Sequence, residues 1–136
     1  MSGTLDILFP YQATTHDITV RVSVSFLADQ SEPAKSRWFW TYHIRVENKG
    51  AAPVQLMSRR WIITDGRGER HRVEGDGVVG AQPIIDPGAC YDYVSGCPLD
   101  TPTGAMEGHY RMIGEDGDSF EVRIPRFELR EPAMGA

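Results

Sequence analysis

The chain has 136 residues, of which 40% are apolar and 24% are charged, and its formal net charge is −5. This length and composition are typical of one folded globular domain and exclude a largely disordered chain. An acidic chain without clustered Lys and Arg is a poor nucleic-acid binder, and no segment has the roughly 20 apolar residues that span a bilayer. We therefore expect neither nucleic-acid binding nor a membrane span.

Two cysteines, Cys90 and Cys97, are too few to form a disulfide framework. The first residues lack the basic stretch and apolar run of a secretory leader. We therefore expect reduced thiols and a cytoplasmic location.

The first two expected strands have side chains that alternate between two faces, one of them mainly apolar. Residues 16–27 place apolar and β-branched side chains on one face, which is typical of a half-buried strand. Residues 37–48 form the second strand, which is expected to be central because one face carries Trp38, Trp40, Tyr42, Ile44 and Val46.

The middle of the chain predicts a hairpin. Residues 54–64 are apolar but interrupted by polar positions, so they form either two short strands or one strand with a bulge. The sequence Asp65-Gly66-Arg67-Gly68 is a strong turn signal, because Asp and Gly tolerate positive φ. Residues 70–74 would be the returning strand.

Three further strands are expected over residues 89–95, 107–113 and 119–124, and Pro125 should end the last one. Pro98 and Pro102 make residues 96–104 an expected loop. No segment of ten or more residues has helical periodicity. The pattern predicts an all-β sandwich over residues 16–129, flanked by tails at 1–15 and 130–136.

An unusual loop covers residues 75–83, in which Gly75, Gly77 and Gly80 have the spacing G-x-G-x-x-G. Such glycines cradle a pyrophosphate when the loop leads into a helix, whereas a short strand is expected here. The loop therefore has three interpretations: a phosphate cradle, a tight bulged crossing, or a binding edge that exposes Val78 and Val79.

Metal and catalytic signals are weak. The four histidines are widely separated, and Glu74 and Asp76 by themselves do not make a cation site. Ser58 and Ser95 have no neighbouring histidine in the sequence. The aromatic residues of the second half either line a recognition surface or belong to the core; they are Trp61, Tyr91, Tyr93 and Tyr110.

Five segments together resemble the ApaG family: SRRWIITD at 58–65, V-x-G-x-GVVG-x-QP at 73–83, PG at 87–88, Y-x-SG at 93–96, and TP-x-G-x-M-x-G-x-Y at 101–110. The resemblance covers about Thr15 to Leu129. It implies a fibronectin type III-like sandwich of two antiparallel sheets, a bacterial stand-alone domain, and no established catalytic activity. Related domains are fused to eukaryotic F-box adaptors and to a polymerase-delta-interacting protein. Bacterial members are genetically linked to cobalt resistance, to magnesium efflux and to an operon encoding a diadenosine tetraphosphate hydrolase.

The chain departs from the family pattern at two positions. Arg60 stands where many members carry His or Tyr, which weakens a metal-ligand role there. Ala81 stands where many carry an acidic residue, which argues against direct cation binding by the loop.

The sequence thus predicts a non-enzymatic binding module without metal or cofactor, which binds a protein partner or a small anionic ligand. Two alternatives remain open: a nucleotide or pyrophosphate binder, with or without hydrolysis, and a divalent-cation sensor using Glu74, Asp76 and a histidine. An exposed strand edge is also compatible with a homodimer. The candidate binding residues are Arg59, Arg60, Trp61, Gly75, Asp76, Gly77, Val78, Val79, Gly80, Gln82 and Pro83.

Overall fold

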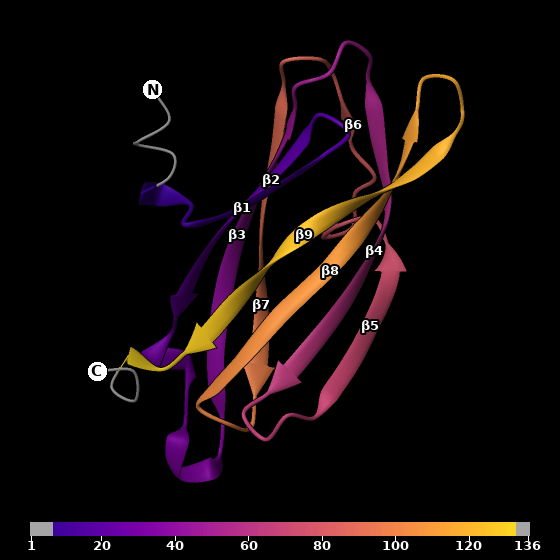
Figure 1. Ribbon diagram of the computed structural model, residues 1–136. Coiled ribbons are helices and arrows are strands. Elements are labelled where there is room, and N and C mark those ends of the chain that lie inside the picture. Colours follow the sequence, from indigo (N-terminus) through magenta and orange to yellow (C-terminus); the bar gives the residue numbers. More distant parts are fainter. Residues whose placement is uncertain (1–6, 133–136) are drawn as a thin grey trace.

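The computed structural model describes residues 7–132, which form the predicted sandwich of two antiparallel sheets (Figure 1). The first sheet has the order β1-β2-β3-β7, with bounds Tyr11–Thr15, Ile18–Phe26, Trp38–Asn48 and Cys90–Leu99. The second has the order β5-β4-β8-β9, with bounds Arg70–Asp76, Val54–Asp65, Thr103–Gly114 and Ser119–Arg130. The short β6 (Ile84–Ile85) pairs with β4, and two 3₁₀ turns, η1 (Ala28–Gln30) and η2 (Pro33–Lys35), join β2 to β3. No helix within residues 7–132 has the length and apolarity needed to cross a bilayer.

The core lies between the sheets and follows the alternation read from the sequence. Along β3, every second residue from Trp40 to Asn48 is buried. β9 alternates in the same way on either side of Pro125, where two consecutive buried residues, Ile124 and Pro125, shift the pattern by one. The expectation that Pro125 ends the last strand is wrong, because β9 continues to Arg130. The largest fully buried side chains come from both sheets; they include Trp40, Tyr110, Phe127, Ile18, Ile44 and Leu56. Period-two patterning therefore places one apolar face of each sheet against the other.

Of the two alternatives for residues 54–64, the single bulged strand is the one found. β4 is continuous, and its pairing with β8 shifts register between Leu56 and Ser58. The pairing of β8 with β9 shifts between Met106 and Gly108. A Cβ at Gly108 would lie 2.0 Å from the carbonyl oxygen of Arg60, so the bulged sheet requires glycine there.

Two expectations about loops and tails are wrong. Part of the expected N-terminal tail, Tyr11–Thr15, is β1 and pairs with β2 in continuous register. The expected loop 96–104 is also wrong at both ends, because β7 continues to Leu99 and β8 begins at Thr103. Pro98 is tolerated because β7 lies at a sheet edge, where a missing N–H need not break a ladder.

The two lateral sides of the sandwich differ. On one side, β1 and β9 are in contact, and Arg123 and Glu128 donate their backbone N–H groups to the side-chain oxygens of Thr15 and Tyr11 at 3.2 and 3.4 Å. On the other side, the free edges are β7 in the first sheet and β5, continued by β6, in the second. The sandwich is therefore closed at β1/β9 and bordered by two unpaired strand edges at β5/β7.

The glycine motif has a structural explanation. Gly77 and Gly80 have φ of +62° and +80°, and a Cβ at Gly77 would lie 2.2 Å from the carbonyl oxygen of Ala81. Val78 and Ala81 exchange both backbone hydrogen bonds around Val79 and Gly80, which both have positive φ, so this segment is a two-residue hairpin turn. Val78 is fully buried, and Val79 is 65% exposed. The expected exposure of both valines is therefore wrong for Val78.

The turn between β4 and β5 is organised by a buried carboxylate. Asp65 Oδ1 accepts the backbone N–H groups of Arg67 and Glu69 at 2.9 and 3.0 Å. Burial raises the pKa of Asp65, but these two bonds and the Arg67 guanidinium outweigh burial, so the pKa lies below its ordinary value. The ionised side chain therefore stabilises the turn above the ordinary carboxylate pKa of about 3.9.

We expect Gly77→Ala to destabilise the protein by about 2 kcal/mol or more, because the added methyl group strains the backbone and meets a carbonyl. Gly80→Ala, which meets open space, should cost about 1 kcal/mol for positive φ alone. Val79→Asn should increase stability, because Asn tolerates the left-handed region. Urea unfolding measures all three variants. Equal losses for the two alanine variants would contradict this explanation of the motif.

Unfolding at acidic pH should reveal how much the ionised side chain of Asp65 contributes to stability. A depressed folded-state pKa means that stability is present above pH of about 4 and is lost as the pH falls through the folded value. Asp65→Asn keeps an acceptor oxygen but no longer titrates, so its unfolding free energy should fall less steeply from pH 4 to pH 2 than that of the wild type. Urea midpoints across this range measure the effect, and identical slopes would contradict it.

Candidate functional site

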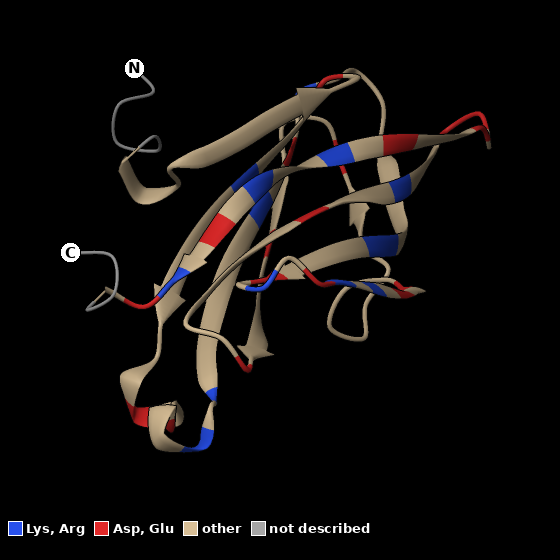
Figure 2. Ribbon diagram, turned by 60° about the horizontal axis from the view of Figure 1, so that its bottom comes forward, with Lys and Arg blue, Asp and Glu red and all other residues tan. Residues whose placement is uncertain are grey.

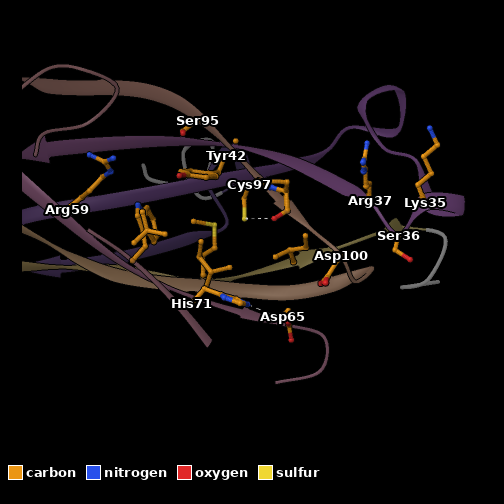
Figure 3. Close-up of a pocket in the computed structure, with 17 residues that line it drawn as sticks. Lys35, Ser36, Arg37, Tyr42, Arg59, Asp65, His71, Ser95, Cys97 and Asp100 are labelled. Carbon is orange, nitrogen blue, oxygen red and sulfur yellow. Dashed lines mark hydrogen bonds and ion pairs between the residues drawn. The ribbon is translucent and has the colours of Figure 1, made fainter. Parts of the chain in front are cut away.

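A groove of about 880 Å³ opens between the free edges of β5 and β7 (Figure 3). His71 and Val73 form the β5 wall, and Ser95, Cys97 and Leu99 form the β7 wall. The floor consists of inward-facing side chains of β3, β4 and β8: Tyr42, Trp61, Ile63 and Met106. The groove therefore borders the edge of the core, where no strand contact of the described chain joins the two sheets.

The aromatic floor is rigidly packed. The Trp61 ring meets the rings of Tyr42 and Phe127 edge-on, at centroid distances of 5.5 and 5.9 Å, and Tyr42 and Phe127 are 5.6 Å apart. Trp61 is only 2% exposed. The three rings come from β4, β3 and β9, so they join the two sheets directly beneath the groove. A ligand in the groove would meet a preformed surface.

Arg59 closes one end of the groove. Its Nη1 donates to the carbonyl oxygens of Asp76 and Gly77 at 3.0 and 2.8 Å. Gly75 leaves room for this side chain, since a Cβ there would lie 3.0 Å from the guanidinium nitrogens. No carboxylate of the described chain forms an ion pair with Arg59. Its positive charge is therefore available at the groove.

The opposite end is closed by the turn between β4 and β5. Arg67 Nη2 contacts Asp100 Oδ2 at 2.9 Å, and Gly66 donates its backbone N–H to Thr101 Oγ1 at 2.9 Å. These bonds tie the turn to the crossover from β7 to β8. Lys35 and Arg37 form an outer rim there, where both lie within 4 Å of Glu32.

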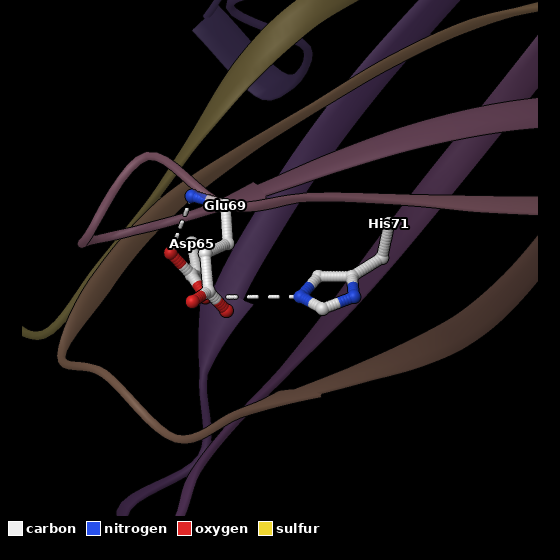
Figure 4. Close-up of side chains that lie close together, drawn as sticks. All are labelled: Asp65, Glu69 and His71. Atoms are coloured by element: carbon white, nitrogen blue, oxygen red, sulfur yellow. Dashed lines mark hydrogen bonds and ion pairs between the residues drawn. The ribbon is translucent and has the colours of Figure 1, made fainter.

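A cluster of possible cation ligands also lies at this end (Figure 4). It consists of Asp65, Glu69 and His71, with 3.7 Å between His71 Nε2 and Asp65 Oδ2. Arg67 Nη2 already lies 3.5 Å from the same carboxylate oxygen. The expected pair Glu74 and Asp76 is not part of this cluster. The arrangement is accounted for as an ion-paired turn.

The buried thiol and phenols are held in their neutral forms. Burial raises the pKa of Cys97 to about 11, so its thiol is protonated at neutral pH. The hydroxyl groups of Tyr93 and Tyr110 hydrogen-bond to each other in the core, and burial raises the pKa of both. Tyr93, Tyr110 and Trp61 therefore belong to the core, as one of the two interpretations expected, while Tyr91 is half-buried.

The structure divides the candidate binding residues into two groups. Arg59 and Trp61 line the groove, and Gly75 makes room for Arg59. The others lie away from it. Arg60 projects from the outer face of β4 and pairs with Glu74 at 3.2 Å. The hairpin turn carries Gly77, Val78, Val79 and Gly80, and the segment after it is tied to β4 through Gln82 Nε2 with Met57 and through the Pro83 carbonyl with Leu56.

Sequence reasoning missed most of the groove. Tyr42, Ser95, Cys97 and Leu99 follow the same alternation as ordinary core residues, so their pattern does not reveal that the sheets stay apart here. His71 was part of an expected strand only. The available signal was the run of charges on residues 70–74, which is typical of an edge strand.

Among residues 7–132, no histidine is paired with a nucleophilic side chain. No hydrogen bond joins a Ser, Thr or Cys side chain to a histidine in this part of the chain. His43 instead pairs with Asp92 at 2.9 Å, and Asp92 also accepts from Arg45.

Charged residues of both signs are spread along the whole fold, with a run of acidic positions at the tip of the β8–β9 hairpin (Figure 2).

Comparison with known proteins agrees with the resemblance in the motifs. The model of the ApaG domain matches residues 28–114. The chain is 49% identical over 124 residues to the protein ApaG of Sinorhizobium fredii, covering 91% of this chain and 95% of the relative. It is 50% identical over 122 residues to the protein ApaG of Brucella suis, covering 90% and 94%.

Solved structures support the same assignment. A putative ApaA protein from Bordetella pertussis is 46% identical, with a TM-score of 0.83 over 85% of this chain and 94% of that one. The C-terminal domain of wzt, at 8% identity and a TM-score of 0.52, shares the fold alone. The domain match and the extent of the sequence identity show that this chain belongs to the ApaG family.

Proposed function

We propose that this chain is a non-enzymatic binding module whose ligand lies in the groove between β5 and β7. One observation carries the proposal: a groove opens between two free strand edges above a packed aromatic floor, whereas the β1/β9 side of the sandwich is closed by strand contacts. A concave, mainly apolar surface with a few polar groups is the usual form of a ligand site. This moves the predicted site from the glycine loop to the groove and keeps Arg59 and Trp61.

The chemistry of the groove favours a ligand with an apolar body and a negative group. Ile63, Val73 and Leu99, which are half-buried or exposed, offer apolar contact above the buried floor, and Arg59 offers a cation without a carboxylate partner. This arrangement fits both ligand classes expected from the sequence, a protein partner and a small anionic molecule. The links to cobalt resistance and magnesium efflux, and the cytoplasmic location, stay predictions.

The nucleotide or pyrophosphate alternative depends on free N–H groups in the glycine loop. Gly77, Val78 and Ala81 donate theirs to the carbonyl oxygens of Met57, Ala81 and Val78. The Arg59 guanidinium donates to carbonyls of the same segment. These groups are already used within the fold, so the loop geometry does not favour a phosphate cradle over the groove.

An anionic aromatic dye tests the proposed site. We expect 1-anilinonaphthalene-8-sulfonate to bind with enhanced fluorescence, and Ser95→Phe, which fills the groove, to weaken its affinity at least about tenfold. Arg59→Gln should weaken it about threefold or more by removing the cation. Ser25→Phe, on the outer face of the same sheet, is the matched control and should bind as the wild type does. The absence of dye binding, or equal effects of both phenylalanine variants, would contradict the site.

Cys97 reports on access to the groove. In Cys90→Ser, which removes the exposed thiol, iodoacetamide should react slowly with Cys97, and the rate should rise about tenfold per pH unit from pH 7 to pH 10, because only the thiolate reacts and its pKa is about 11. Saturating dye should slow the reaction further. Mass spectrometry measures the rate, and a plateau below pH 9 would contradict the assigned environment.

A further inference from the structure

We propose that the free edge of β7 binds an extended, acidic segment of a partner protein as an added strand, with alternate apolar side chains of that segment entering the groove. The inference deepens the proposed function and rests on it. Strand addition is a common form of peptide recognition, in which backbone hydrogen bonds supply affinity and side-chain pockets supply selectivity.

The backbone of β7 is suitable for this pairing. Its register with β3 is unbroken from Trp38↔Leu99 to Glu47↔Cys90. Phe39 accepts the backbone N–H of Leu27 at 2.9 Å, so its backbone faces the β2 side, and its pairing partner Pro98 directs its own backbone away from β3. Backbone direction alternates along an antiparallel strand. Gly96 and Val94, two and four residues away, therefore direct their N–H and C=O groups toward the free edge. No backbone bond from another segment of the described chain covers this edge.

The composition of the two edges selects β7 over β5. An edge strand is usually protected from pairing by charged side chains. Most of β5 is protected in this way, because Arg70, His71, Arg72 and Glu74 are all exposed. In β7, residues 93–97 carry no charged side chain, and Val94 is 58% exposed. The edge that forms the β7 wall of the groove is therefore without charge over residues 93–97.

The direction of the β7 side chains explains why apolar residues should occupy every second position of the partner segment. Tyr93, Ser95 and Cys97 point inward from β7, whereas Val94 and Gly96 point outward. A strand added to this edge continues the same pleat, so every second side chain would point toward the groove. Those side chains would pass above Trp61 and meet Val73 on the β5 wall.

The cations at the groove indicate that the partner segment carries negative charge. Arg59 lines the groove without a carboxylate partner in the described chain, and the outer rim carries Lys35 and Arg37, two cations that share the single carboxylate of Glu32. These cations occur in a protein with a net charge of −5, so the positive potential is local. A second copy of the chain would bring the same cations to the interface, because a two-fold contact matches a surface with itself. An acidic segment of another protein is the better complement.

A selection from a displayed library of random twelve-residue peptides, run on the full chain, tests the proposal. We expect enriched peptides to be net negative, with apolar residues at every second position. Val94→Pro removes an edge-directed N–H and should weaken a selected peptide at least tenfold, whereas Val94→Thr should not. Because Val94→Pro can disturb folding, a second arm uses the selected peptide N-methylated at alternate positions. N-methylation of the positions whose N–H groups face β7 should abolish binding, whereas N-methylation of the intervening positions should not.

The outcomes separate this inference from the proposed function. Peptides that lose affinity with Ser95→Phe but not with Val94→Pro, and that tolerate methylation of either alternate set, would overturn strand addition and leave the groove as a binding site. Peptides insensitive to all of these changes, or the absence of enrichment, would overturn both. Enriched peptides with apolar spacing of three and four residues, or a dimer that Val94→Pro dissociates, would overturn the inference in favour of a helical partner or a second copy.

Discussion

Three interlocked rings, Tyr42, Trp61 and Phe127, are the contact on which the rest of the structure depends. They come from both sheets, and Trp61 meets the other two rings edge-on, so the three rings fix the distance between the sheets at the point where no strand contact of the described chain does so. On the β1/β9 side the core behind them is covered by hydrogen-bonded strands. On the β5/β7 side they are the boundary between core and groove. The same aromatic packing thus stabilises the fold and forms the candidate binding surface.

Two ties fix the ends of the hairpin that carries β5. Arg59 binds carbonyls of Asp76 and Gly77 at one end, and the contact of Arg67 with Asp100 joins the other end to the crossover after β7. Between these ends, no strand of the described chain lies between β5 and β7. The resulting edges retain unpaired backbone groups, which natural sheets normally cover or protect with charge. Charge protects β5, whereas residues 93–97 of β7 have no such protection.

The fold could be predicted from the sequence to the extent that it depends on local alternation. The faces of β2, β3 and β9 follow directly from period-two patterning, and the bulge in β4 was one of two expected readings. β1 was missed because its five residues, mostly small and polar, carry little apolar signal and are fixed by pairing with β2. The end of β7 was missed because proline signals a loop in sequence and is tolerated at a sheet edge in three dimensions.

The groove was predictable only in part, because the glycine spacing drew attention to a loop whose glycines have structural roles. Gly75 makes space for Arg59, and Gly77 and Gly80 supply positive φ for a turn that buries Val78. The groove depends on the absence of a strand between β5 and β7, and a sequence pattern carries no signal for such an absence. Tyr42 and Cys97 are buried core residues and Leu99 packs against the core, so nothing in their sequence pattern marks them as the lining of a groove.

Amide hydrogen exchange with and without a selected peptide tests the central claim most directly. If the groove between β5 and β7 is the binding surface, the peptide should slow exchange in β7, most strongly at Val94 and Gly96, and leave β1 and β9 unchanged. Slowed exchange confined to residues 77–83, or to the β1/β9 side, would contradict the account.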